Sequence, residues 1–112
     1  MSIYKKSAPV DAVAFAKALA DDTRQRIMTL CCCERLTVGD ITAKIGVAQP
    51  TVSHHLAILR EAGLVTAEHQ GRETFYSLNQ ERLSVCCGQL MVRFAPDEKV
   101  THTVKDALSK RH

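Results

Sequence analysis

The cysteines of this chain are the residues best suited to chemistry, and they fall into two blocks. Cys31, Cys32 and Cys33 are consecutive, and Cys86 and Cys87 are adjacent. The odd total of 5 argues against complete pairing in disulfides. A site built from sulfur alone favours soft ions such as As(III), Cd(II), Hg(II) or Cu(I). Arsenic in this state takes three thiolates, a number that these residues can supply.

Helix geometry limits how many of these thiols can meet. Consecutive residues of an α-helix point about 100° apart, so Cys31, Cys32 and Cys33 cannot all face one ion unless the helix frays. A loop is expected directly after them, which makes a fray at this place reasonable. Cys31 follows the inner face set by Ile27 and is our first choice of ligand. The later block, residues 86–87, lies near the apolar seam of another helix, so one thiol can bind while the other packs.

A second group of residues has the chemistry to read DNA bases. Val52, Leu56 and Leu59 recur at helical spacing and predict a helix with one buried face. The opposite face carries mostly neutral polar side chains, which suit the base edges of a major groove. In helix-turn-helix docking the N-terminal residues of such a helix reach the bases, while arginines contact phosphates. The predicted base contacts are Gln49, Thr51, Ser53 and His54, and the predicted phosphate contacts are Arg60 and Arg72.

The adjacent histidines His54 and His55 do not suit a shared metal ion or catalysis. Neighbouring helical residues point about 100° apart, so the two rings cannot easily hold one ion. We expect His55 to be a partly buried packing residue. An enzyme would need a nucleophile with a positioned base, and both histidines belong to the DNA-facing helix, away from the cysteines. Without a phosphate-cradling glycine loop either, we expect no enzymatic activity.

Local signals predict the helices that position these residues. Residues 1–8 read as a flexible lead, and a first helix begins near Asp11. Asp22 can cap a second helix that runs to about Cys32. Thr37, with an acidic residue three positions later, predicts the start of a third helix, and Gly46 predicts its end. The DNA-reading helix follows after a tight turn.

The pattern then changes from helical to alternating. Residues 65–70 alternate, residues 74–78 are rich in β-forming side chains, and Gln70-Gly71 predicts the turn between them. The resulting hairpin carries Arg72 at its tip. Asn79 can cap a last long helix that Pro96 stops. Residues 97–112 form a polar tail in which Val100, Val104 and Leu108 allow a weak further helix.

Length and composition predict one small domain that can bind DNA. The chain has 112 residues, of which 46% are hydrophobic, and a net charge of +3. This mild basicity permits DNA binding without demanding it. No apolar run approaches about 18 residues, and no apolar signal region follows the N-terminus, so we expect a cytoplasmic protein without a membrane partner.

Three ordered segments, residues 19–28, 46–65 and 70–78, resemble the ArsR/SmtB family of bacterial repressors. The resemblance covers roughly residues 10 to 95 and departs at Ala48, where the family usually has a capping serine. It implies a mainly α fold with a β-hairpin wing, a winged helix-turn-helix that dimerises through its terminal helices. The DNA-binding and dimerisation domain would then be residues 9–96. Such homodimers bind an inverted-repeat operator in double-stranded DNA.

The resemblance also implies where metal sites would lie, and two of them are lost here. Family sensors of arsenic and cadmium place cysteines at the positions of Thr37 and Gly39. Zinc sensors carry an Asp-x-His motif where this chain reads Gln80-Glu81-Arg82, with no histidine before His102. The cysteine blocks remain. In this fold the last helix helps to build the dimer interface and the second helix packs near it, so thiols from both could converge within one protomer or across the dimer.

Three interpretations of the thiols therefore stay open. We favour a repressor that leaves its operator when a soft metal(loid), As(III) above all, binds the five cysteines. The alternative is a persulfide or redox switch through cysteine oxidation. Cys31 fits that alternative, whereas Cys86 and Cys87 lie about two turns before the position that the resemblance implies. The third interpretation is packing, because a free cysteine is often a small buried hydrophobic residue. Five thiols in two blocks make it less favoured.

Overall fold

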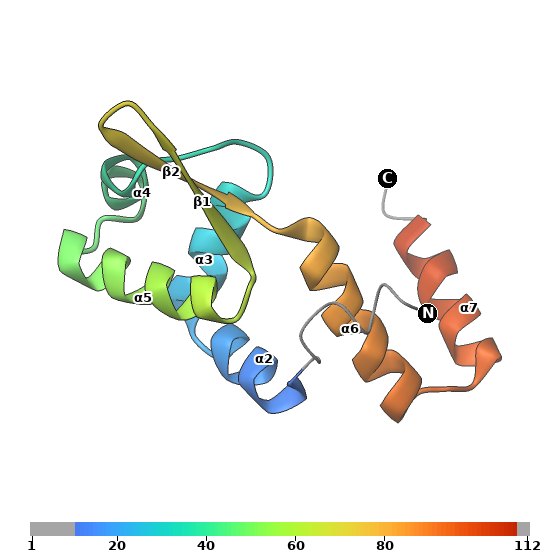
Figure 1. The fold of residues 1–112 in the computed structure, drawn as a ribbon. Coiled ribbons are helices and arrows are strands. Elements are labelled where there is room, and N and C mark those ends of the chain that lie inside the picture. Colours follow the sequence, from blue (N-terminus) through green and yellow to red (C-terminus); the bar gives the residue numbers. More distant parts are fainter. Residues whose placement is uncertain (1–10, 110–112) are drawn as a thin grey trace.

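A computed structural model of the protein describes residues 11–109, in which a two-stranded antiparallel hairpin packs beside α3, α4 and α5 at one edge of the molecule (Figure 1). The predicted lead, residues 1–8, lies outside this range, as do residues 110–112. The mainly α fold with a β-hairpin wing is confirmed. The elements are α2 (Ala12–Leu19), α3 (Asp22–Cys31), α4 (Val38–Ile45), α5 (Gln49–Glu61), β1 (Val65–Gln70), β2 (Glu73–Leu78), α6 (Gln80–Phe94) and α7 (Glu98–Ser109).

Side chains cap most of the helices where the sequence places cap residues. Asp11 accepts hydrogen bonds from the first turn of α2, and Asn79 accepts one from the first turn of α6. Thr37 and Asp40 form a reciprocal capping box at the start of α4. The cap of α3 is Asp21 rather than the predicted Asp22, because Asp21 is the extended residue whose Oδ1 accepts from the Arg24 amide at 2.9 Å.

Two helix ends matter for the candidate sites. Helix α3 ends at Cys31, one residue before the predicted end, and its C-cap Cys32 still has helical φ and ψ. Helix α5 begins after Ala48, which provides no side-chain hydrogen bond to cap it. The missing serine therefore leaves the start of the helix that is predicted to read DNA without a side-chain cap.

The wing is a regular hairpin whose register runs from Val65 opposite Leu78 to Gln70 opposite Glu73. Its turn is Gly71-Arg72, one residue later than predicted, with Gly71 at a φ of 65° that glycine adopts without strain. Leu36 pairs with Tyr76 on the other side of β2, so the segment after α3 adds a short bridge to the wing.

The core is formed where α3 contacts α2, α4, α5 and β2. Val52, Leu56 and Leu59 of α5 are at most 1% exposed, which confirms the predicted buried face of that helix. Two cysteines, Cys31 and Cys86, belong to the same core. The core residues thus fix α5 against α3 and leave the opposite face of α5 in solvent.

Helices α6 and α7 lie on the side of the molecule away from α4 and α5 (Figure 1). Phe94 and Val92 at the end of α6 are 74% and 73% exposed. The polar tail contains the weakly predicted helix as α7, with Val100, Val104 and Leu108 on its surface. Within residues 11–109, no helix is long and apolar enough to cross a membrane.

Candidate nucleic-acid interface and thiol site

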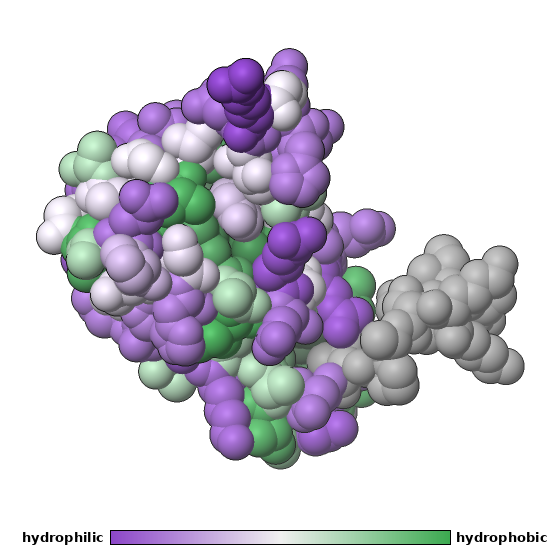
Figure 2. Space-filling model, turned by 60° about the vertical axis from the view of Figure 1, so that its left-hand side comes forward, coloured by the Kyte–Doolittle hydropathy of each residue, from purple (hydrophilic) through white to green (hydrophobic). Residues whose placement is uncertain are grey.

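The outer face of α5 carries all the predicted base-contacting residues in solvent. Gln49 begins the helix, and Thr51, Ser53 and His54 follow on exposed positions of its first turns. Arg60, near the end of α5, is also exposed. The side of the molecule that Figure 2 turns forward is mixed, with hydrophilic side chains on both sides of apolar ones that show along its middle. The uncapped N-terminus of α5 adds free backbone N–H groups, which favour phosphate.

Arginine side chains fix both α5 and the hairpin to the rest of the chain. On α3, Arg24 Nη1 lies 3.0 Å from Nδ1 of His55, which is half-buried on α5. His54 and His55 have ring centroids 5.8 Å apart and tilted planes, which is a packing contact. The exposed Arg72 sits in the wing turn, as predicted. Behind it, Arg35 contacts both wing strands, with Nη1 2.7 Å from Glu68 on β1 and Cζ 4.5 Å from the ring centroid of Phe75 on β2.

Cys31 is the most deeply placed thiol of the first block. It is 1% exposed at the end of α3. Burial, with smaller contributions from Cys32 and Glu34, raises the pKa of Cys31 to about 11. Since the thiolate is the metal ligand and the nucleophile, this environment opposes both roles at neutral pH. Cys31 is held as a packed thiol in the structure.

Cys32 and Cys33 lie beyond the last residue of α3. Cys32 is half-buried and Cys33 is exposed. A hydrogen bond between the two side chains, with some burial and the charge of Cys33, holds the pKa of Cys32 above its usual range. The main chain here is tied to α6, because Gln80 Nε2 donates to the Cys32 carbonyl at 2.7 Å. These two residues therefore lie side by side at the junction of α3 and α6, where they line a pocket together with Gln80.

The second block divides between core and solvent. Cys86 is 2% exposed, and Cys87 is exposed. Burial raises the pKa of Cys86, Arg82 acts in the opposite direction, and Cys87 adds to the increase. Cys86 borders a pocket of about 280 Å³ whose lining also includes Asp11 and Arg82.

The single chain does not assemble the two blocks into a metal centre. Among the residues that the structure describes, no group of three or more His, Cys, Asp or Glu side chains could hold a metal ion. Cys31 and Cys86 both belong to the core, while Cys33 and Cys87 face solvent. A three-thiolate site would need a partner chain or a rearrangement of the α3–α6 junction.

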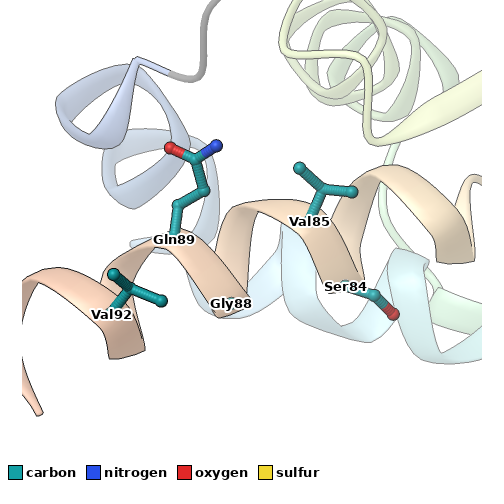
Figure 3. Close-up of a pocket in the computed structure, with 5 residues that line it drawn as sticks. All are labelled: Ser84, Val85, Gly88, Gln89 and Val92. Atoms are coloured by element: carbon teal, nitrogen blue, oxygen red, sulfur yellow. The ribbon is translucent and has the colours of Figure 1, made fainter. Parts of the chain in front are cut away.

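One side of α6 is open along its length. Ser84, Val85, Gly88, Gln89 and Val92 line a pocket of about 690 Å³ there (Figure 3). Val85, Gln89 and Val92 project from the same side of the helix (Figure 3). This surface is small and partly apolar, and it lies away from the DNA-reading helix.

Sequence reasoning missed the residues that connect the sites: Arg24, Arg35 and Gln80. Each contacts an element distant in the chain, so helical or strand periodicity carries no signal for it. The only available hint was that Arg35 lies two residues after the cysteine block. The exposure of the predicted contact residues follows from periodicity, whereas these connecting residues depend on tertiary packing.

Comparison with known proteins gives a consistent result. The model of "Bacterial regulatory protein, arsR family" matches residues 21–67. The transcriptional repressor SdpR of Bacillus subtilis is 38% identical over 63 residues, which are 56% of this chain and 70% of that protein. The arsenical resistance operon repressor of the same organism is 40% identical over 78 residues, which are 63% of this chain and 74% of that protein.

A solved structure agrees with the fold across almost the whole chain. The ArsR-like transcriptional regulator from Rhodococcus sp. RHA1 has a TM-score of 0.72 at 21% identity, over 97% of this chain and 95% of that one. Relatives of this kind are DNA-binding regulators of transcription rather than enzymes. The chain with this winged helix and exposed recognition face belongs to the arsR family of bacterial regulatory proteins.

Proposed function

We propose that the protein is a cytoplasmic homodimeric repressor that a thiol-binding inducer, with As(III) favoured, releases from an inverted-repeat DNA operator. The observation that carries this proposal is the position of Cys32 and Cys33 at the α3–α6 junction, where Gln80 is bound to the Cys32 carbonyl. A ligand on these thiols acts directly on the joint between the DNA-reading body and the last long helix. The relative named as an arsenical resistance operon repressor supports arsenic as the inducer.

A dimer through the terminal helices fits the exposed apolar residues there. Val92 and Phe94 of α6 are 73% and 74% exposed, and the lining of the α6 pocket is partly apolar. Pairing along this side keeps both α5 helices free to face DNA (Figure 1). Half-sites about one DNA turn apart tolerate little misplacement, so a shift of α6 against α3 lowers affinity. Coupling of this kind is typically about 1–3 kcal/mol.

The second candidate is a redox or persulfide switch, and exposure of two thiols favours it. Cys33 and Cys87 are both exposed, so an oxidant reaches them without unfolding. Burial of Cys31 and Cys86 counts against their acting as first reactants. The two candidates share the thiols and differ in whether electrons are transferred.

The test is release of operator DNA from the reduced protein, followed by fluorescence anisotropy. As(III), Cd(II) and a persulfide donor are titrated separately against the native chain, Cys32→Ser/Cys33→Ser and Cys86→Ser/Cys87→Ser. If As(III) releases the DNA from the native chain but not from one of the double cysteine variants, the metalloid proposal is supported. Release by the persulfide donor alone, reversed by a reductant, replaces it with the redox switch. If no reagent releases the DNA, both proposals fail.

A further inference from the structure

The segment from Cys32 to Leu36 joins a thiol pair to the wing. Cys32 and Cys33 both border an open pocket of about 470 Å³. Cys32, the C-cap of α3, keeps a helical φ of −65° and ψ of −34°, whereas Cys33 lies beyond the helix. Since both residues line this pocket, a ligand that enters it meets both side chains.

We propose that Cys32 and Cys33 form a two-thiol site for trivalent arsenic, and that Arg35 transmits its occupation to the wing. This inference rests on the proposed function and names the thiols that receive the inducer. The ligand class is arsenite or a monosubstituted organoarsenical, which share two exchangeable oxygen ligands. Each thiol proton passes to one arsenic-bound hydroxide, two water molecules leave, and two As–S bonds replace two As–O bonds. No electrons are transferred.

Arg35 lies two residues after Cys33 and contacts three residues of the wing. Its Nη1 donates to Glu68 Oε1 at 2.7 Å and its Nη2 donates to Gln70 Oε1 at 2.8 Å, both on β1. Its Cζ lies 4.5 Å from the ring centroid of Phe75 on β2. One guanidinium thus holds both strands of the hairpin that carries Arg72.

The main chain is held by hydrogen bonds on each side of Arg35, so a movement of the thiols displaces Arg35. Leu36 N donates to the Tyr76 carbonyl at 3.1 Å, and Tyr76 N donates to the Leu36 carbonyl at 2.8 Å. At the other end, Gln80 Nε2 donates to the Cys32 carbonyl at 2.7 Å. Drawing two sulfurs onto one arsenic shifts the short chain between these anchors. The side chains of Arg35 and Glu68 are 45% and 70% exposed, and ion pairs this exposed are weak enough for a small shift to break.

The first test uses phenylarsine oxide, which bridges two thiols with loss of one water. Mass spectrometry of the native protein should show one phenylarsenic group on residues 32–33, retained in Cys87→Ser and absent in Cys32→Ser/Cys33→Ser. Hydrogen exchange across residues 65–78 should then become at least about fivefold faster on loading, the lower end of typical coupling. Unchanged wing exchange in the loaded native protein, or equal loading of the double variant, overturns the inference.

The second test separates the link from the proposed function. Arg35→Ala should still take up phenylarsine oxide and bind operator DNA, but its wing exchange and DNA affinity should no longer respond to loading. The double variant Glu68→Ala/Gln70→Ala changes two exposed residues of β1 and should give the same result as Arg35→Ala. It replaces Arg35→Ala in the test if that variant does not fold. An undiminished response in these variants overturns the link. If loading loosens the native wing but DNA stays bound, the proposed function fails and the link stands.

Discussion

Arg24 Nη1 lies 3.0 Å from Nδ1 of His55, and this contact joins the recognition helix to α3. A guanidinium has only donors, so Nδ1 is the acceptor and the neutral ring carries its proton on Nε2. The same side chain donates to the Lys17 carbonyl at 3.0 Å and to the Ala18 carbonyl at 2.8 Å, near the end of α2. Arg24 therefore ties α2, α3 and α5 together.

Removing this side chain should cost much of the stability of the winged helix. The side chain of Arg24 is 12% exposed, and hydrogen bonds to a charged group contribute about 1.5–3 kcal/mol. We expect Arg24→Ala to lower the free energy of unfolding by about 2–3 kcal/mol and to weaken DNA binding, measured by urea unfolding and anisotropy. Arg26→Ala is the matched control, because Arg26 is exposed and its bond to the Ile45 carbonyl is 3.4 Å long. Equal losses in both variants would contradict a special role for Arg24.

The four thiols that differ most in burial should react in a fixed order. Cys33 and Cys87 are exposed, whereas Cys31 and Cys86 are 1% and 2% exposed. A thiol-specific disulfide reagent should label the exposed pair first and reach the buried pair only through local opening. Mass spectrometry of peptides taken during labelling measures the order. Early labelling of Cys31 would show that the end of α3 opens readily in solution.

Cys31 should make the fold sensitive to alkali. Its pKa is raised from 9.0 to about 11 by burial, so the folded state holds the thiol proton more tightly than the unfolded chain. The resulting stability is fully present below pH 9 and is lost as the pH rises towards 11, up to about 2 kcal/mol. Urea unfolding between pH 7.5 and 10.5 should show this decline, and Cys31→Val should flatten it. A profile unchanged by that substitution would mean that another group is responsible.

The helices and strands could be predicted where one local sequence signal determines the element. The contacts that build the candidate sites could not be predicted in this way. Asp11, Thr37 and Asn79 cap helices within their own turn, so the sequence around each is sufficient. The contact between Arg24 and His55 spans 31 positions and depends on how α3 packs against α5. Phe94 shows the same limit, because a helical pattern gives an apolar face and cannot say whether this chain or a partner covers it.

The uncapped start of α5 offers a stabilising substitution. Ala48 has the extended φ of −61° and ψ of 145° of an N-cap, but no side chain that accepts a hydrogen bond. Ala48→Ser should restore that acceptor and add about 0.5–2 kcal/mol to the free energy of unfolding, read from urea melts. Ala43→Ser, at an exposed position inside α4, is the control and should bring no gain. No gain from Ala48→Ser would mean that the cap is already satisfied by solvent.

Arg60 and Arg72 should contribute to DNA affinity through phosphate contacts. Both are exposed, one near the end of α5 and one in the wing turn. Each phosphate contact releases counterions, so Arg60→Ala and Arg72→Ala should each reduce the slope of log affinity against log salt by about 0.9. Loss of a phosphate contact weakens binding to all sequences alike, whereas Ser53→Ala should mainly relax specificity. Arg93→Ala, on α6 away from α5, should leave the slope as it is (Figure 1). An unchanged slope in both arginine variants would remove them from the DNA interface.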